Sequence, residues 1–268
     1  MILTSKFLKE IVELICALIY AAFLPLIRKD LSCVVIYYHS VKKEGVRQFE
    51  KQMAYLAKNY TVVKASHIKN APTQGKRTIV AITFDDAFVS ILKNALPVLK
   101  KWGLPANIFV PTGNLGKPPQ WEILNRCFDK DETVISKEQV AKLNNEGFEV
   151  SSHTVSHPVL TGIDKDRLRY ELLNSKRELE RIIGCKVLAI SYPYGAYGKR
   201  VCEAAKKAGY ELGFTTEPCI LNYQTDNLQI GRFAVSTRDS LMEFKLKVSG
   251  AYQVTKYLRA MKRKLMHQ

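Results

Sequence analysis

The chain has 268 residues, 47% hydrophobic and 25% charged, which is enough for one large globular domain with a buried core. Its 41 Lys and Arg residues against 25 Asp and Glu give a net charge of +16, which indicates an anionic partner such as nucleic acid, a lipid surface or a phosphorylated substrate. The six cysteines are scattered without a C-x-x-C pair, which argues against a disulfide framework or a cysteine zinc site.

Residues 1–30 are interpreted as an N-terminal hydrophobic, membrane-associating segment that precedes a single domain over residues 31–268. The run LICALIYAAFLPLI, Leu14–Ile27, contains no charge. As a helix it would be roughly 21 Å long, shorter than the roughly 30 Å hydrocarbon core of a bilayer. It predicts a signal anchor, a cleaved signal peptide or a helix lying in the membrane interface, with a buried helix of the domain as the alternative. No clear A-x-A-like site follows it, which disfavours cleavage.

Short apolar strands alternate with amphipathic helices along the rest of the chain. The strands lack strict polar alternation, as is typical of parallel strands buried on both faces. The predicted strands are Cys33–Tyr38, Thr78–Phe84, Ala106–Val110, Phe148–Ser152, Val187–Tyr192, Leu212–Thr215 and Gln229–Val235.

Helices are predicted between these strands. One covers Phe49–Lys58, a second begins with a capping box from Ser136 to Gln139, and a long third helix has Asp164 as its N-cap. A further short helix ends at Gly209. A βαβα series of this length predicts an α/β barrel or an open doubly wound sheet.

The chain ends in a basic segment, KYLRAMKRK at Lys256–Lys264, which contains no acidic residue. As a helix it would place Tyr257, Met261 and Leu265 opposite the basic side chains. Such a helix suits an anionic membrane surface, and a solvated terminal helix is the equal alternative.

Polar side chains follow two of the predicted strands. Asp85 and Asp86 come directly after the strand in IVAITFDD, and His153 and His157 follow the strand that ends at Ser152. The carboxyl ends of parallel strands meet at one edge of the sheet, so we expect these side chains to lie close together. One carboxylate and two imidazoles with open positions suit a catalytic divalent ion, with Zn²⁺ expected first.

The second carboxylate of the Asp-Asp pair then has a separate role. If Asp86 binds the ion, Asp85 remains available to accept a proton from the attacking water. Taken alone, such a pair is more often a helix cap plus a surface charge, and lone histidines are commonly surface residues or satisfied core ones; the two features together, each at a strand end, are far more specific.

The stretches TFDD, SSHTVSHP and SYPYG together resemble the first three motifs of the polysaccharide deacetylases, the NodB-homology family, and the resemblance extends from about Cys33 to Val235. It implies a distorted (β/α)7 TIM-like barrel and metal-dependent removal of an acyl group, usually N-acetyl, from a sugar. Matched by motif, Asp85 is the catalytic base and Asp86, His153 and His157 are the metal ligands. Pro193 and Tyr194 would contact the substrate, with the Tyr194 N–H donating to the oxyanion.

The sequence departs from the family pattern at three places. Ser191 stands where the third motif often has an arginine that pairs with the base, and Arg232 is the candidate replacement as well as a candidate substrate contact. The Asp/Trp-rich fourth motif has no clear counterpart. The late L-x-H motif that supplies the general acid is absent, and His39, at the end of the first strand, is the candidate acid instead.

These features predict a metal-dependent hydrolase that removes an N-acetyl group from an amino sugar in a membrane-associated, lipid-linked glycan or in a surface polysaccharide. The missing motifs keep open an alternative, a catalytically weak relative that binds glycan or lipid without hydrolysis. A nucleic-acid partner is not expected, because the chain has no zinc-finger spacing and no RNA-binding sheet motif.

The predicted location is an anionic membrane surface. The scattered cysteines favour the cytoplasmic face, whereas a signal anchor would place the domain outside. Lys6 and Lys9 precede the apolar run and Arg28 and Lys29 follow it, so the positive-inside rule does not decide between them. The sequence gives no prediction of the oligomeric state.

Overall fold

The computed structural model describes residues 2–27, 33–69, 78–121, 129, 131–222 and 224–258. Within these residues the strands are β1 (Cys33–Tyr38), β2 (Thr61–Val63), β3 (Ile79–Phe84), β4 (Asn107–Val110), β5 (Glu149–Ser152), β6 (Ala189–Ser191), β7 (Leu212–Phe214) and β8 (Phe233–Ala234).

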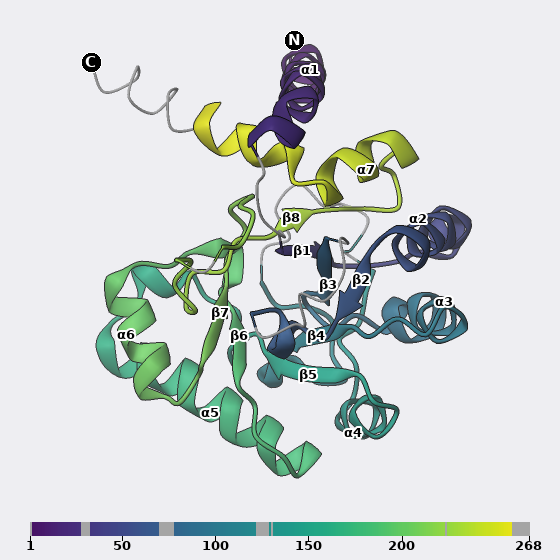
Figure 1. Ribbon diagram of the computed structural model, residues 1–268. Coiled ribbons are helices and arrows are strands. Elements are labelled where there is room, and N and C mark those ends of the chain that lie inside the picture. The colour runs from purple at the N-terminus through teal and green to yellow at the C-terminus, as the bar shows by residue number, and fades with distance from the viewer. Residues whose placement is uncertain are drawn as a thin grey trace.

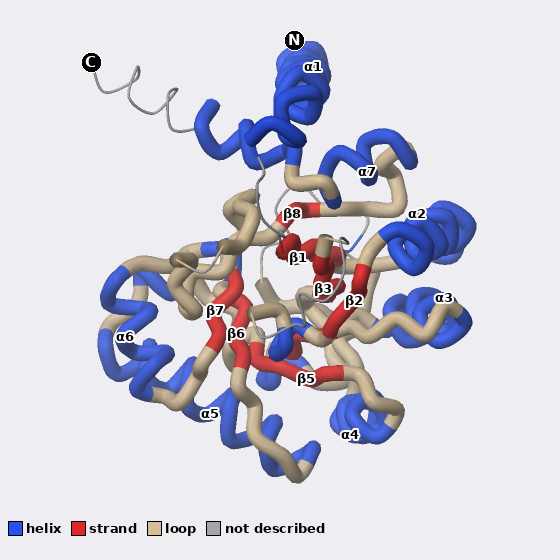
Figure 2. Tube along the Cα trace, in the orientation of Figure 1, coloured by secondary structure: helices blue, strands red, loops and turns tan. Residues whose placement is uncertain are grey.

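All of these strands pair in parallel in one curled sheet with the order β7-β6-β5-β4-β3-β1-β8, and β2 pairs with the first half of β3 (Figure 1, Figure 2). In the described part of the chain, the end strands β7 and β8 do not pair with each other, and the segment before β8 reaches β7 through a parallel bridge between Phe214 and Ile230 and neighbouring backbone hydrogen bonds. This incompletely closed sheet confirms the predicted distorted α/β barrel.

Helices surround the outer side of the sheet (Figure 2). They are α2 (Val46–Asn59), α3 (Leu96–Lys101), α4 (Lys137–Asn145), α5 (Lys165–Ile183), α6 (Lys199–Lys207) and α7 (Leu241–Val248). The N-terminal helix α1 (Ile2–Ile27) lies outside this ring, next to α7 and the C-terminal helical turns (Figure 1).

Successive side chains of the central strands enter two different cores. Val34 and Ile36 of β1 pack with apolar residues of the surrounding helices, whereas Val35 packs with Phe109 and Phe214 among strand and loop residues inside the barrel. The strands are therefore apolar on both faces, which explains the continuous hydrophobic runs in the sequence. Because successive side chains alternate between the two faces, Asp85, four residues after Ala81, is on the same face as Ala81, which belongs to the inner cluster.

The predicted helix signals are present. Ser136 accepts a hydrogen bond from the Gln139 N–H, and the Gln139 side chain accepts one from the Ser136 N–H. The Asp164 side chain accepts a hydrogen bond from the Arg167 N–H at the start of α5. Gly184 ends α5 in the left-handed conformation, with φ of 71°.

Two strands differ from the prediction. The strand expected over Gln229–Val235 is reduced to β8, because Ile230 pairs with β7 while Phe233 and Ala234 belong to the ladder with β1. The strand β2 was not predicted, because three residues are too few to show a periodic pattern.

The predicted N-terminal helix is also present. Leu14, Ala17 and Ala21 of α1 pack against Leu246 and Ala251 of the domain. In the described residues no helix combines the length and apolarity needed to cross a bilayer. The basic helix expected over Lys256–Lys264 lies largely outside the described residues, although residues 254–258 are helical.

Candidate active site

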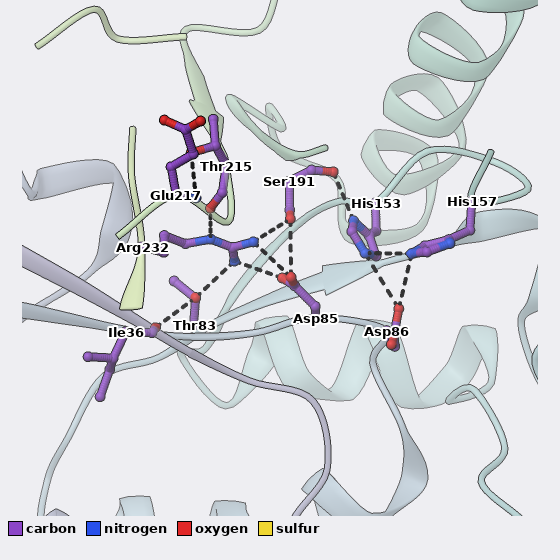
Figure 3. Close-up of polar contacts among 10 residues, drawn as sticks. All are labelled: Ile36, Thr83, Asp85, Asp86, His153, His157, Ser191, Thr215, Glu217 and Arg232. Carbon is purple, nitrogen blue, oxygen red and sulfur yellow. Dashed lines mark hydrogen bonds and ion pairs between the residues drawn. The ribbon is translucent and has the colours of Figure 1, made fainter. Parts of the chain in front are cut away.

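The polar residues predicted to meet do meet at the carboxyl edge of the sheet. Asp85 and Asp86 follow β3, His153 follows β5, and His157 lies on the loop after it (Figure 3). All four side chains are buried, with 0% to 4% of each residue exposed. Buried polar groups of this kind are costly unless they have partners, so the site depends on the contacts among them.

The backbone around these residues is unusual. Within the described residues, five residues other than glycine have a positive φ: Asp86 (66°), Ala87 (48°), Thr154 (68°), His157 (58°) and Tyr194 (58°). All five lie in the loops that carry the site. Such conformations are unfavourable for residues with a Cβ, and they persist where the surrounding structure fixes them. The fold therefore holds this site in a strained, defined geometry.

Asp86, His153 and His157 converge on one point. Asp86 Oδ1 lies 3.5 Å from the Nε2 atom of each histidine, and the two Nε2 atoms are 3.1 Å apart. His153 Nδ1 is 2.8 Å from the Ser191 carbonyl oxygen, so Nδ1–H donates there and the Nε2 lone pair points into the site.

This donor set fits a divalent metal ion. The three ligand atoms lie within 4.8 Å of one another, all buried. A cation would stabilise two imidazole nitrogens and a carboxylate oxygen that face each other at such short distances. The number and type of ligands match a catalytic zinc site, which keeps a position open for a reactant.

Asp85, next to Asp86 in the chain, is not one of these three residues and pairs with Arg232, at the start of the segment that leads into β8. The two Nη atoms of Arg232 lie 2.8 Å from the two carboxylate oxygens of Asp85, which is a bidentate ion pair. Arg232 is fully buried, and it also donates to Thr83 Oγ1 at 3.1 Å and to the Thr215 carbonyl oxygen at 3.0 Å (Figure 3).

This arrangement explains the serine in the third motif. Ser191 Oγ accepts a hydrogen bond from Arg232 Nη2 at 2.8 Å and lies 3.3 Å from Asp85 Oδ2. A small side chain at this position, at the end of β6, leaves room for the guanidinium of Arg232, which comes from the segment before β8. Of the two predicted roles of Arg232, this geometry favours pairing with the base over contact with a substrate.

The environment of Asp85 keeps it charged. Burial raises the pKa of Asp85, but the Arg232 guanidinium, with contributions from His153 and His39, outweighs burial and lowers the pKa to about 2. Asp85 is therefore an anion over the whole physiological pH range.

The remaining predicted residues lie around the same edge. His39 directly follows β1, is half-buried, and is close enough to Asp85 to contribute to its lowered pKa. Pro193 is buried, and the Tyr194 ring lies 4.7 Å from that of His157. The next residue, Gly195, has φ of 68°, and a Cβ there would lie 2.0 Å from Thr216 Oγ1, so this turn requires glycine.

Two contributors were not predicted from the sequence. Glu171 on α5 is buried, and its carboxylate accepts hydrogen bonds from the Val155 and Ser156 N–H groups at 2.9 and 2.8 Å and from Ser156 Oγ at 2.5 Å. It thereby anchors the loop between the two histidines. A signal for it existed, because Glu171 occurs between Leu168 and Leu172 on the apolar stripe of the helix.

The second is Trp121, in the loop after β4, whose ring stacks on that of His157 with 4.6 Å between centroids and an angle of 25°. Together with Tyr194 it encloses the His157 imidazole between aromatic rings. No pattern in the sequence of this loop singles out the contact.

Comparison with known proteins agrees with this geometry. The family model described as polysaccharide deacetylase matches residues 73–213. The protein YxkH of Bacillus subtilis (strain 168) is 30% identical over 193 residues, which cover 69% of this chain and 64% of that protein. The poly-beta-1,6-N-acetyl-D-glucosamine N-deacetylase of Staphylococcus aureus (strain MRSA252) is 28% identical over 220 residues, 75% of this chain and 72% of that one.

Solved structures share the fold. The Streptococcus pyogenes deacetylase PplD, in complex with acetate, superposes with a TM-score of 0.69 at 22% identity, covering 82% of this chain and 99% of that one. IcaB from Ammonifex degensii superposes with a TM-score of 0.65 at 24% identity, covering 83% and 97%. At these identities the likeness is one of fold, whereas the family match over residues 73–213 includes the TFDD, SSHTVSHP and SYPYG stretches. The chain belongs to the polysaccharide deacetylase family.

Proposed function

We propose that the protein is a metal-dependent hydrolase that removes the N-acetyl group from an amino sugar. The observation that carries this proposal is the position of Asp85. It is a charged carboxylate fixed by Arg232, directly beside a carboxylate and two imidazoles that converge on one point. A base next to an electrophilic site is what hydrolysis of an amide requires.

Asp86, His153 and His157 are the proposed ligands of the ion, with Zn²⁺ expected. A bound divalent ion would polarise the acetyl carbonyl and lower the pKa of water. The chain's own residues carry the other tasks. Asp85 accepts a proton from the attacking water while the water oxygen bonds to the acetyl carbon. The Tyr194 N–H donates a hydrogen bond to the carbonyl oxygen as negative charge develops there.

His39 is the proposed general acid. As the bond between the acetyl carbon and the sugar nitrogen breaks, His39 donates a proton to that nitrogen, so the products are acetate and a free amine. Pro193 and Tyr194 would form part of the wall of the pocket that holds the acetyl group. Arg232 would act through Asp85, since its guanidinium is buried and already bonded to Asp85, Thr83 and Thr215.

The proposed substrate is an N-acetylated glycan. The relative from Staphylococcus aureus is named for poly-beta-1,6-N-acetyl-D-glucosamine, which supports a β-linked N-acetylglucosamine polymer as the first candidate. The net charge of +16 and the apolar N-terminal helix support a substrate at a membrane surface, which keeps lipid-linked acetylated sugars as the second.

The test is acetate release from a panel of N-acetylglucosamine oligomers and lipid-linked acetylated sugars. The metal-loaded protein is expected to release acetate, and chelation or Asp85→Asn is expected to lower the rate at least a hundredfold. Full activity of the Asp85→Asn variant would contradict the proposed base. If the metal-loaded protein binds a glycan but never releases acetate, the protein is a binding member of the family instead.

A further inference from the structure

Over residues 11–23, helix α1 is apolar on the side exposed to solvent as well as on the side that packs on the domain. Over residues 11–23 its only charged residue is Glu13, and this residue lies toward the domain. There it lines a cavity of about 380 Å³ together with Asp239, Glu243 and Lys247. A helix packed on a soluble domain normally turns its apolar stripe inward and its charged residues to solvent.

Within the described side chains, residues 11–23, the side of α1 that faces away from the domain is entirely apolar. We call it the outer face of α1 and define it as Ile11, Val12, Ile15, Leu18, Ile19, Ala22 and Phe23. The six large side chains of this face are between 36% and 58% exposed. A contiguous apolar surface of this kind marks a site of interaction with a partner or a membrane.

Neighbouring elements extend this surface. Met242 at the start of α7 and Tyr257 in the last described helical turn are 52% and 54% exposed. Figure 1 places both elements beside α1. Of the eleven large apolar side chains that are exposed in the described residues, eight lie on these three elements, and the other three, Trp102, Val159 and Tyr170, belong to other elements.

The charges that flank these elements in the sequence indicate what the surface binds. Arg28 and Lys29 follow α1 in the sequence, and residues 256–268 include five Lys and Arg residues and no acidic residue. Val254, two residues before this basic segment, packs in the same cluster as Ala17 of α1. A second copy of the chain would bring like charges together in a molecule that already carries +16, whereas an anionic lipid surface would neutralise them.

We propose that the outer face of α1 is a docking surface for an anionic lipid bilayer. The helix lies in the plane of the interface, with Ile15 and Ile19 directed into the acyl chains. The positive charge of the chain favours anionic over neutral headgroups. This assigns the membrane contact that the proposed function assumes. It does not depend on catalysis, since neither Asp85 nor the metal ligands take part in it.

The test is co-sedimentation of the full chain with vesicles, without metal or substrate, so that a failure of the proposed deacetylase activity leaves the result unaffected. Vesicles of phosphatidylcholine and phosphatidylglycerol in equal amounts are compared with vesicles of phosphatidylcholine alone. The wild-type chain is expected to bind the anionic vesicles at least about tenfold more tightly. The Ile15→Glu/Ile19→Glu variant is expected to bind them about a hundredfold more weakly than the wild type.

A matched control replaces two exposed apolar residues elsewhere, in Trp102→Glu/Tyr170→Glu, which changes the net charge by the same amount. This variant should bind at least about tenfold more tightly than the outer-face variant. Equal loss of binding in both variants, or a wild-type chain that stays in the supernatant, would overturn the proposal.

Two further measurements distinguish lipid docking from misfolding and from dimerisation. An Ile15→Ser/Ile19→Ser variant with an unchanged thermal unfolding midpoint should still lose most vesicle binding, because it alters the outer face of α1 without unfolding the domain. Sedimentation velocity of the wild-type chain is expected to give a monomer. A dimer that Ile15→Glu/Ile19→Glu converts to a monomer would identify a second copy as the occupant and would refute lipid docking.

Discussion

Asp85 is a buried carboxylate whose charge is maintained by its neighbours. Burial raises its pKa, but Arg232, His153 and His39 lower it from 3.8 to about 2. Because the folded-state pKa lies below the unfolded value, the contribution of the Asp85 charge to stability is present above about pH 4 and is lost as the pH falls toward about 2.

This sign gives a test in metal-free protein. The unfolding free energy of the wild type should exceed that of Asp85→Asn by an amount that decreases by roughly 2 kcal/mol as the pH is lowered from about 5 to about 2. Urea unfolding at a series of pH values measures this difference. A difference that stays constant over that range would show that Asp85 does not have a depressed pKa.

Arg232 is the only partner of Asp85, within the described residues, that forms a two-bond ion pair with it. Arg232→Gln leaves the Asp85 carboxylate buried without a cation, and it should lower the unfolding free energy by about 3–5 kcal/mol and abolish activity. Arg232→Lys keeps the positive charge but cannot form the bidentate pair, so its unfolding free energy and activity should be intermediate.

The matched control is Arg181→Gln, which breaks a bidentate pair with Glu178 on the surface of α5. That change should cost less than about 1 kcal/mol, because exposed ion pairs contribute little. Equal destabilisation by the two glutamine variants would contradict the assignment of a stabilising role to the buried pair.

Glu171 is proposed to position the two histidine ligands through the loop between them. Glu171→Ala removes acceptors for two N–H groups and one hydroxyl, and it should reduce Zn²⁺ affinity at least tenfold and destabilise the protein by about 3 kcal/mol. Glu171→Gln should retain most of the Zn²⁺ affinity and most of the stability. Its amide oxygen can accept from the two N–H groups while the amide NH₂ donates to Ser156 Oγ.

Calorimetric zinc titration and thermal unfolding measure these effects, with Glu178→Gln on the exposed side of the same helix as the control. If Glu171→Ala binds Zn²⁺ as tightly as the wild type, the loop does not need this anchor.

Among the turns that build the site, the one over Pro193–Gly195 has the least space. Gly195→Ala would place a Cβ 2.0 Å from Thr216 Oγ1 at a positive φ, so it should displace Tyr194 and strongly reduce activity. Gly184, at the end of α5, has nearly the same φ but nothing within 4 Å of the added Cβ. Gly184→Ala should therefore cost about 1 kcal/mol and leave the rate unchanged.

Thermal unfolding and acetate release separate the two glycine variants. A Gly195→Ala protein with normal activity would show that the turn tolerates displacement and that the Tyr194 N–H does not need this position.

The elements of the barrel differ in how far the sequence predicts them. The strands β1 and β3 are long apolar runs buried on both faces, and they were predicted within one residue. The strands β2 and β8 are too short to have a period and exist because neighbouring strands offer edges to pair with, which is a property of the tertiary structure.

The same distinction applies to the site. Asp85, Asp86, His153 and His157 were predictable because each lies at a strand end or just after one, and parallel strands bring those ends together. The pairing of Arg232 with Asp85 could be proposed only as a replacement for a missing motif residue, because 147 positions separate the two and only barrel closure brings them together. Glu171 and Trp121 were missed because their roles depend on loop conformations that no local pattern encodes.

At the scale of the whole molecule, the candidate active site lies at the carboxyl edge of the sheet, and the outer face of α1 lies elsewhere on the surface. The candidate site draws on loops after β1, β3, β5 and β6 and on the segment before β8, so it exists only when the sheet has curled (Figure 2). We therefore expect metal binding to raise the thermal unfolding midpoint of the whole domain, with excess Zn²⁺ stabilising the wild type and not His153→Ala.

The most direct test of the proposed metal site is a crystal structure of the zinc-loaded protein with anomalous diffraction data at the zinc edge. We predict one strong anomalous peak about 2.0–2.2 Å from Asp86 Oδ1 and from the Nε2 atoms of His153 and His157, with Asp85 still paired to Arg232. A peak at another position, or none at these three side chains, would contradict the proposed site.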